Sequence, residues 1–327
     1  RAAYMYSGMA DVAALTQNED YITAIDTIWD NVVSKKLALT GGIGARHEGE
    51  AFGDDYELPN LTSYNETCAA QANILWNHRL FLLTGDAKYI DVLERTLYNG
   101  FLSGVGLDGQ SFFYVNPLSS DGEYRFNRDN ALTRQPWFET SCCPTNIVRL
   151  LPSLSGYIYA LRSDELFVNL YMTNNGTIEI NEQIVEIAQF TNYPWDGLVS
   201  LHVTVPEATS FTLKLRIPVW AQGQPLPSDL YTYINTTHET ATLQIDGESV
   251  PIEIENGYVS ISKEWHGTSH IELNLPMPIQ RVIAHQQVDT LRSKVAIERG
   301  PLVYAIETAD NPDGVLQQAL ADDTVLT

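Results

Sequence analysis

The hydrophobic pattern of this chain changes its period once, near residue 163, and that change limits the folds available to it. Before this point, apolar residues recur at helical spacing, as in Ile25, Trp29 and Val33. After it, short runs such as residues 201–205 alternate apolar and polar side chains and are separated by Gly, Pro, Asn and Asp, which is typical of strands. The sequence therefore predicts a helical domain followed by a β domain.

The helical part contains an internal repeat. Residues 83–90 (Leu-Thr-Gly-Asp-Ala-Lys-Tyr-Ile) align with residues 15–22 (Leu-Thr-Gln-Asn-Glu-Asp-Tyr-Ile), and each segment joins two predicted helices. A repeated αα-hairpin is the signature of a helical array or toroid. Helices are predicted at residues 4–15, 20–36, 67–83 and 87–102, with a last one that follows Pro144 and ends near residue 160.

The β part is expected to form an antiparallel β-sandwich, because many short strands at this spacing pack as two layers. It occupies residues 161–307, after a helical domain of residues 1–160, and the acidic tail of residues 308–327 is predicted to be helical. Together these assignments describe an α+β multidomain chain. The predicted strands are residues 166–171, 177–180, 201–205, 212–217, 241–245, 258–261 and 270–275.

The net charge of the chain limits the kinds of ligand and partner that it can bind. The chain has 41 acidic and 19 basic residues among 327, which gives a formal net charge of −22. This field repels nucleic acids and anionic membranes, so neither is expected as a partner and a neutral, sugar-like ligand is favoured. No apolar run approaches the length of a membrane span. No targeting segment is visible, which leaves the compartment open between a bacterial-type cytoplasm and periplasm.

All three cysteines fall in two short segments, residues 66–68 (Glu-Thr-Cys) and 141–144 (Ser-Cys-Cys-Pro). Three thiols and one carboxylate are a ligand set that tetrahedral Zn²⁺ accepts. Both segments precede apolar helical patterns, and a thiol at a helix N-terminus has a lowered pKa. Two plainer interpretations stay open, namely a purely structural zinc and cysteines buried without metal. The candidate ligands are Glu66, Cys68, Cys142 and Cys143.

Two long loops interrupt the helices. Residues 40–60 are rich in glycine and carboxylates and contain His47 and Glu50, and residues 104–140 contain Tyr114 among several aromatic side chains. Long loops on a rigid scaffold tend to carry function. His47 is therefore a candidate pocket residue, whereas Tyr114 is as compatible with the core as with a platform that stacks on a sugar.

Six motifs carry a resemblance to a known family. They are residues 40–44 (Thr-Gly-Gly-Ile-Gly), 49–52 (Gly-Glu-Ala-Phe), 55–60 (Asp-Tyr-Glu-Leu-Pro-Asn), 66–69 (Glu-Thr-Cys-Ala), 141–144 (Ser-Cys-Cys-Pro) and 298–304 (Glu-Arg-Gly-Pro-Leu-Val-Tyr). The chain resembles glycoside hydrolase family 127, the β-L-arabinofuranosidase type. The similarity runs over most of the chain, and the spacing of the cysteines and glutamates makes it specific.

The resemblance implies a fold, a cofactor and a mechanism. The fold would be part of an (α/α)₆ barrel followed by a β-sandwich, and the enzyme would be a retaining glycosidase with Zn²⁺ on the four candidate ligands. Cys142 would be the nucleophile, Glu50 the general acid/base, and Tyr114 would lie beside the sugar. A full barrel needs more helices than this chain carries. The chain is therefore expected to require the missing N-terminal half, and a homodimer is a further candidate assembly.

Two functions of different classes are compatible with these features. The first is a zinc-thiolate glycosidase that releases terminal L-arabinofuranose, or a related plant cell-wall sugar, from an oligosaccharide or glycan. The second is a noncatalytic carbohydrate-binding or interaction protein on the same scaffold, with a structural zinc. The presence of both Cys142 and Glu50 favours the first, because retaining hydrolysis needs a nucleophile and a proton donor.

Overall fold

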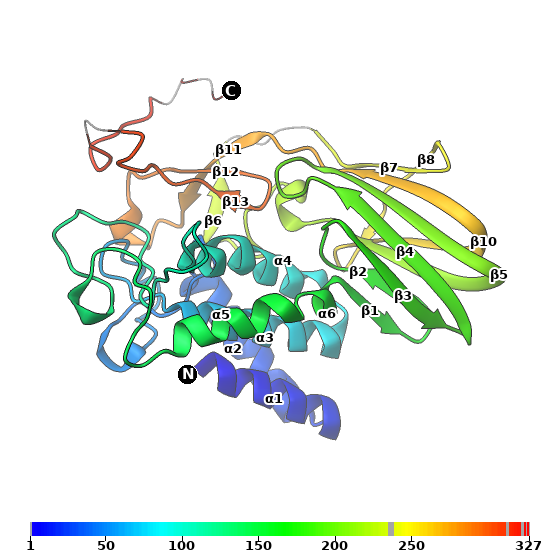
Figure 1. Cartoon of the computed structure of the whole chain (residues 1–327), viewed down its shortest axis with the longest axis horizontal. Coiled ribbons are helices and arrows are strands. Elements are labelled where there is room, and N and C mark those ends of the chain that lie inside the picture. The colour runs from blue at the N-terminus through cyan, green and yellow to red at the C-terminus, as the bar shows by residue number, and fades with distance from the viewer. Residues whose placement is uncertain (1, 235–238, 312–313, 322–323, 325, 327) are drawn as a thin grey trace.

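The computed structural model describes residues 2–234, 239–311, 314–321, 324 and 326, and it separates a helical layer from two β-sheets. Figure 1 shows the helices gathered on one side of the molecule, the large sheet on the other, and the small sheet over the helices near α4. The predicted order of a helical domain followed by a β-rich region is confirmed. The helices are α1 (Ala2–Thr16), α2 (Glu19–Lys35), α3 (Thr67–Thr84), α4 (Ala87–Arg95), α5 (Cys142–Leu150) and α6 (Ser155–Ile158).

The turns between the paired helices have the same geometry, which explains the internal repeat. Gln17 and Gly85 each follow a helix with a left-handed φ, of 53° and 78°. Asn18 and Asp86 come next, and each side chain accepts a hydrogen bond from a backbone N–H in the first turn of the following helix. The hairpins α1–α2 and α3–α4 then pack together through α1 and α3.

Two of the predicted helices are shorter than expected. α4 gives way to a π-helical segment, Thr96–Phe101, and a 3₁₀ turn, Leu102–Gly104, so that the N–H of Gly100 donates to the carbonyl of Thr40 at 2.8 Å. The last predicted helix breaks at a 3₁₀ turn, Leu151–Ser153, whose proline lacks the N–H that a continuing helix would use. The first break lets the loop that begins at Thr40 pack against the helices. The second break is followed by the short helix α6 and then by the first strand.

Two long strands, β5 (Leu198–Arg216) and β10 (Tyr258–Asn274), form the centre of the large sheet. They pair antiparallel along almost their whole length, with one irregularity between Trp265 and Gly267. The prediction of separate strands at this point is therefore wrong, because each long strand replaces two predicted ones. The four predicted strands were residues 201–205, 212–217, 258–261 and 270–275.

The turn signals in these strands mark a bend of the sheet rather than a reversal of the chain. Residues 206–208 and Gly267 lie at the bend, where the alternation of buried side chains pauses and then resumes. On one side of the bend β5 pairs in parallel with β2 (Glu165–Val168), and on the other it pairs antiparallel with β4 (Gln183–Thr191). Side chains from both halves share one core, so the sheet folds over itself as a sandwich.

The remaining strands complete the two sheets. The large sheet also contains β1 (Tyr159–Arg162), β3 (Asn174–Ile180), β7 (Thr242–Ile245), β8 (Glu248–Val250) and β9 (Ile254–Glu255). The small sheet is antiparallel, in the order β13 (Leu302–Val303), β12 (Ala296–Arg299), β11 (Ile279–Ala284) and β6 (Tyr231–Tyr233). The tail, residues 308–327, is not the predicted helix in its described residues. Those residues form turns, at positions 308–310 and 316–317.

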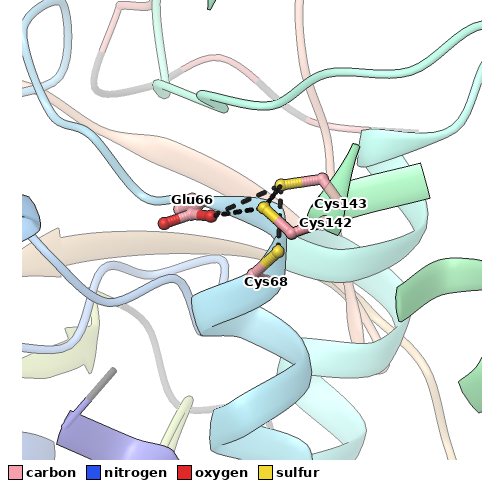
Figure 2. A group of neighbouring side chains, drawn as sticks. All are labelled: Glu66, Cys68, Cys142 and Cys143. Carbon is pink, nitrogen blue, oxygen red and sulfur yellow. Dashed lines mark hydrogen bonds between the residues drawn. The ribbon is translucent and has the colours of Figure 1, made fainter. Parts of the chain in front are cut away.

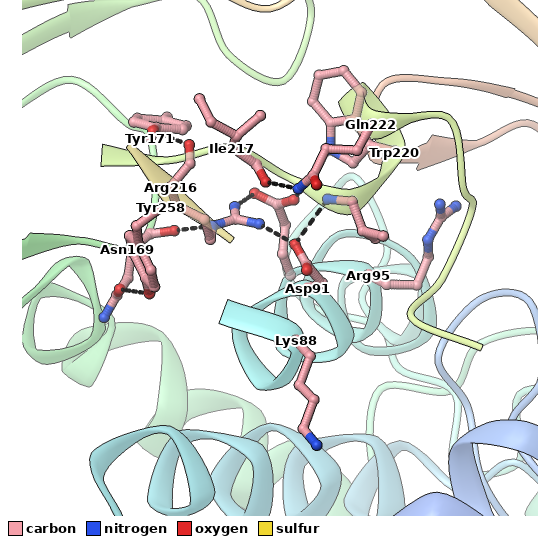
Figure 3. A network of polar contacts seen from close by, with 12 residues as sticks. Lys88, Asp91, Arg95, Asn169, Tyr171, Arg216, Ile217, Trp220, Gln222 and Tyr258 are labelled. Carbon is pink, nitrogen blue, oxygen red and sulfur yellow. Dashed lines mark hydrogen bonds and ion pairs between the residues drawn. The ribbon is translucent and has the colours of Figure 1, made fainter. Parts of the chain in front are cut away.

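Buried ion pairs on α4 join the helical layer to both sheets. Arg216, at the end of β5, donates to Asp91 at 2.7 Å (Figure 3) and also to Glu94. All three side chains are almost fully buried. Arg95 pairs with Glu298 of β12 at 2.8 Å, also out of contact with solvent. Burial raises the pKa of Asp91 to about 7, although Arg216 acts in the opposite direction. Since buried charges are tolerated only when paired, these contacts fix how the sheets sit on the helices.

The helical layer presents apolar side chains to solvent. Met5, Val12 and Leu15 of α1 and Val148 of α5 are exposed, and the two helices are joined by a hydrogen bond from Asn146 to a tyrosine of α1. Several exposed apolar residues on neighbouring helices make a face suited to packing against other protein. Among the described residues, no helix has both the length and the apolar character that a bilayer crossing requires.

Candidate metal centre and active site

The two cysteine-bearing segments meet because each begins a helix. Glu66 occupies the N-cap position of α3, and Cys68 lies in the first turn of that helix. Cys142 and Cys143 are the first two residues of α5, which packs against α3. Both helix N-termini therefore face one place. Unpaired N–H groups there favour negative charge, which suits thiolates and a carboxylate.

The four predicted ligands form one compact group, in which the ligand atoms all lie within 4.8 Å of one another. The Sγ atom of Cys143 is 3.1 Å from that of Cys68 and 4.0 Å from that of Cys142. Oε1 of Glu66 lies 3.6 Å from Sγ of Cys142 and 3.5 Å from Sγ of Cys143. Figure 2 shows these side chains converging from the two helices. All three cysteines are free, and the group can hold a metal ion.

Cys142 is the outermost member of this group. It is half-buried, whereas Glu66, Cys68 and Cys143 are buried. Hydrogen bonds from Cys143 and Tyr114 lower the pKa of the Cys142 thiol to about 5, against the effect of burial. Burial raises the pKa of Cys143, and it raises the pKa of Glu66 to about 7. Because the thiolate is the nucleophilic form of cysteine, Cys142 is the thiol best placed to react.

Tyr114 lies directly beside Cys142. Its hydroxyl is 3.1 Å from Sγ of Cys142, and its ring packs edge-on against Phe138 with 5.5 Å between centroids. The side chain of Asn127 accepts a hydrogen bond from the backbone N–H of Tyr114 at 3.0 Å. The guanidinium of Arg128 lies over the tyrosine ring, 4.7 Å from its centroid. The structure thus brings Tyr114 to the cysteines, and its contact with a sugar stays a prediction.

Glu50 approaches the same place from the loop of residues 40–60. Its φ of 51° is left-handed, which is a strained conformation for a residue with a side chain. Oε1 of Glu50 accepts a hydrogen bond from the hydroxyl of Tyr64 at 3.2 Å and lies 3.9 Å from Nη2 of Arg128. Because Arg128 also covers Tyr114, this cation connects Glu50 to the residue that contacts Cys142.

His47 contacts Tyr64, the residue that donates a hydrogen bond to Glu50. The two rings meet edge-on with 4.8 Å between centroids, and Nε2 of His47 is 3.3 Å from the hydroxyl of Tyr124. Burial lowers the pKa of His47, so the imidazole is neutral at neutral pH. The structure places His47 near Glu50, through Tyr64, and its contact with substrate stays a prediction.

Three other carboxylates of this loop, Asp54, Asp55 and Glu57, pair with basic side chains. Asp55 lies 2.9 Å from Nζ of Lys35, and Glu57 pairs with Arg46. Arg46 also contacts Asp54 at 2.8 Å. These exposed pairs anchor the loop to α2 and to itself, and they leave Glu50 as the carboxylate that the loop brings to Tyr64 and Arg128.

Three polar residues of the site were missed by the sequence analysis. Asn146 donates to Sγ of Cys68 at 3.2 Å, and it follows Cys142 by four residues, a spacing that places both on one side of α5. That spacing is a signal that could have identified Asn146. Tyr64 and Arg128 belong to loops without periodicity, so no pattern in the sequence relates them to Glu50.

Comparison with known proteins places the chain in a family. Three family models match it: the β-L-arabinofuranosidase GH127 catalytic domain over residues 1–156, the GH127 middle domain over residues 165–277, and the glycoside hydrolase family 127 C-terminal domain over residues 279–327. All three are models of glycoside hydrolase domains, and together they cover most of the chain, so the chain is of the glycoside hydrolase class. The chain belongs to glycoside hydrolase family 127, which confirms the resemblance inferred from its motifs.

Individual relatives agree with this assignment. A non-reducing end β-L-arabinofuranosidase of Bifidobacterium longum subsp. longum is 35% identical over an alignment of 328 positions, which covers 98% of this chain and 47% of that protein. A solved GH127 β-arabinofuranosidase is 51% identical with a TM-score of 0.87, over 92% of this chain and 46% of that one. A solved GH127 β-L-arabinofuranosidase of Geobacillus stearothermophilus T6 is 43% identical with a TM-score of 0.87, over 95% of this chain and 47% of that chain. The chain spans about half the length of these relatives.

Proposed function

We propose that the protein is a retaining glycosidase that releases terminal L-arabinofuranose, or a related plant cell-wall sugar, from an oligosaccharide or glycan. The observation that carries this proposal is a half-buried thiol of low pKa, on Cys142, beside Tyr114 and linked through Arg128 to Glu50. Cys142 is the proposed nucleophile and Glu50 the proposed acid/base. The names of the relatives support the choice of sugar.

Zn²⁺ is the proposed metal. With Zn–S bonds of about 2.3 Å and a Zn–O bond of about 2.1 Å, a regular tetrahedron has S···S edges of about 3.8 Å and S···O edges of about 3.6 Å. The S···O separations of 3.5 and 3.6 Å agree with the expected S···O edge. Of the two S···S separations, 3.1 Å is shorter and 4.0 Å is longer than the expected S···S edge. A set of three soft thiols also favours zinc over magnesium or calcium.

Bound by Glu66, Cys68, Cys142 and Cys143, zinc would supply positive charge that keeps the thiols deprotonated. The reaction itself proceeds on the residues of the chain. Sγ of Cys142 forms a bond to the anomeric carbon while the bond from that carbon to the leaving oxygen breaks. The carboxyl group of Glu50 gives its proton to that oxygen.

The second step returns both residues to their starting forms. Glu50, now a carboxylate, takes a proton from a water molecule whose oxygen bonds to the anomeric carbon. The carbon–sulfur bond breaks, and its electron pair stays on Cys142. Two inversions at one carbon leave the configuration of the sugar unchanged, which is the definition of a retaining enzyme. Tyr114, which contacts Sγ, is placed to hold the thiolate in line between the two steps.

We infer that full activity requires helices beyond those described here. The chain spans about half of its relatives, and α1 and α5 present an apolar face suited to further helices. Such helices would close the barrel around the sugar and supply the rest of its contacts. Assays should therefore use the protein with the whole catalytic domain. Analytical ultracentrifugation of the same protein tests whether it is a homodimer.

Metal removal tests this function. A chelator should abolish hydrolysis of an aryl β-L-arabinofuranoside and expose the three thiols to a thiol reagent, because zinc protects thiolates that it binds. Adding one equivalent of Zn²⁺ should restore activity and protect the thiols again, as followed by metal analysis and thiol titration. Full activity in metal-free protein would contradict the proposal. Protected thiols without activity on any arabinofuranoside would favour the noncatalytic alternative.

A further inference from the structure

Arg128 joins the two halves of the proposed catalytic pair. Its Nη2 lies 3.9 Å from Oε1 of Glu50, and its guanidinium carbon lies 4.7 Å from the ring centroid of Tyr114. Tyr114 in turn contacts Sγ of Cys142 at 3.1 Å. One cation therefore touches the acid/base residue and the neighbour of the nucleophile. None of the six family motifs contains it.

The loop that carries Arg128 is held by hydrogen bonds to a buried side chain and by a tight turn. Asn127 is buried, and its Oδ1 accepts hydrogen bonds from the backbone N–H groups of Tyr114 and Arg128, both at 3.0 Å. The next two residues, Asp129 and Asn130, both have left-handed φ values, of 59° and 57°. Asp and Asn adopt this conformation more readily than other residues with a side chain, so the two positions form a tight turn directly after Arg128. These contacts fix the backbone at Arg128, whose guanidinium lies over the ring of Tyr114.

The charges around Glu50 indicate what Arg128 does there. Glu66 is a second carboxylate near enough for the two to repel each other. Tyr64 donates a hydrogen bond to Glu50, and His47, which burial keeps neutral, stands behind that tyrosine. Arg128 supplies positive charge on the other side. A neighbouring cation favours the ionised form of a carboxyl group.

We propose that Arg128 is a positioning residue that holds Glu50 opposite the Tyr114–Cys142 contact. The inference rests on the proposed function, since it needs Glu50 as the acid/base. When Glu50 has given its proton to the leaving oxygen, Arg128 stabilises the carboxylate that remains. That carboxylate then takes the proton of water as the oxygen of water bonds to the anomeric carbon and the bond to Cys142 breaks.

The test compares Arg128→Met with Arg128→Lys in the zinc-loaded protein, on an aryl arabinofuranoside whose good leaving group makes the second step limiting. Arg128→Met should lower kcat about tenfold to a hundredfold, up to the lower end of the effect typical of acid/base catalysis. KM should fall with kcat, because kcat/KM reports the first step, which needs little acid assistance with this leaving group. Arg128→Lys, which keeps a cation at this position, should restore most of the rate.

Azide separates this role from a structural one. Azide attacks the anomeric carbon without needing a base, so it should raise kcat of Arg128→Met toward that of the unchanged protein. The matched control is Arg134→Met, which removes another arginine of the same loop that lies over an aromatic ring, 4.3 Å from the centroid of Phe113. The described contacts of Arg134 are with the carbonyl of Ser103 and the ring of Phe113, so the control should keep its kcat and show no azide rescue.

Defined results overturn the inference. A raised KM at unchanged kcat would make Arg128 a substrate ligand, and a loss that neither azide nor lysine relieves would make it structural. Glu50→Gln is measured alongside to separate this inference from the function on which it rests. If Glu50→Gln is inactive on poor leaving groups and Arg128→Met behaves normally, only the inference fails. If Glu50→Gln keeps full activity, the proposed function fails and the inference falls with it.

Discussion

Replacing Cys142 by serine is expected to lower kcat/KM by about 10⁴- to 10⁶-fold, the scale of losing a nucleophile in other covalent hydrolases. A serine hydroxyl has a far higher pKa than this thiol, whose pKa the site lowers to about 5. The variant should still bind zinc, more weakly, through Glu66, Cys68 and Cys143, because three protein ligands suffice in many zinc sites. Steady-state kinetics and metal analysis on the same preparations check both parts.

Cys143→Ser is the matched control for this prediction. Cys143 is fully buried and offers no face to a sugar, so its loss should act through the metal. Zinc content and thermal stability should fall together, and excess Zn²⁺ should recover part of the activity. Excess zinc should recover none in Cys142→Ser. A Cys142→Ser variant that keeps about a tenth of the activity or more would exclude it as the nucleophile.

Replacing Arg216 by methionine is expected to destabilise the protein by roughly 3–5 kcal/mol, the usual cost of breaking a buried ion pair. The change leaves the carboxyl groups of Asp91 and Glu94 in a buried site without their cation. Thermal and chemical unfolding, followed by circular dichroism, measures the loss. Because this network lies between α4 and β5, the helical layer and the large sheet should then unfold in two separate transitions instead of one.

An exposed arginine provides the comparison. Arg292 pairs with Asp289 at 2.6 Å, but both side chains are largely in solvent, so Arg292→Met should change stability by less than about 1 kcal/mol. Adding Asp91→Asn and Glu94→Gln to Arg216→Met should recover much of the lost stability, because it removes the unpaired charges. Equal effects of Arg216→Met and Arg292→Met would show that the buried network does not hold the layers together.

The helices could be predicted because two independent signals coincide at their ends. At Asn18 and Asp86 a capping side chain precedes the apolar period, and the structure begins α2 and α4 one residue later. The long strands lacked such agreement. Pro206 and Gly267 are turn-forming residues by type, yet they mark a bend within β5 and β10, because pairing with neighbouring strands holds the backbone extended on both sides.

The metal site could be predicted because its ligands come as two pairs, each within three consecutive residues, so one contact between two helix starts assembles all four. The buried network was not. Asp91, Glu94 and Arg95 have the helical spacing of a solvated face, and the partner Arg216 lies 125 residues from Asp91. Arg128 was hidden for a related reason, since its position depends on the fold of a long loop that has no period.

The most direct test of the account is a search for the covalent intermediate. The zinc-loaded Glu50→Gln protein, with the whole catalytic domain present, is mixed with an activated aryl β-L-arabinofuranoside, quenched in acid, digested and examined by mass spectrometry. The first step needs little acid assistance with this leaving group, whereas the second lacks its base, so the intermediate should accumulate. The account predicts that the peptide containing Cys142 carries one added pentose on sulfur. A pentose on a different residue, or an unmodified Cys142 with release of sugar of inverted configuration, would contradict it.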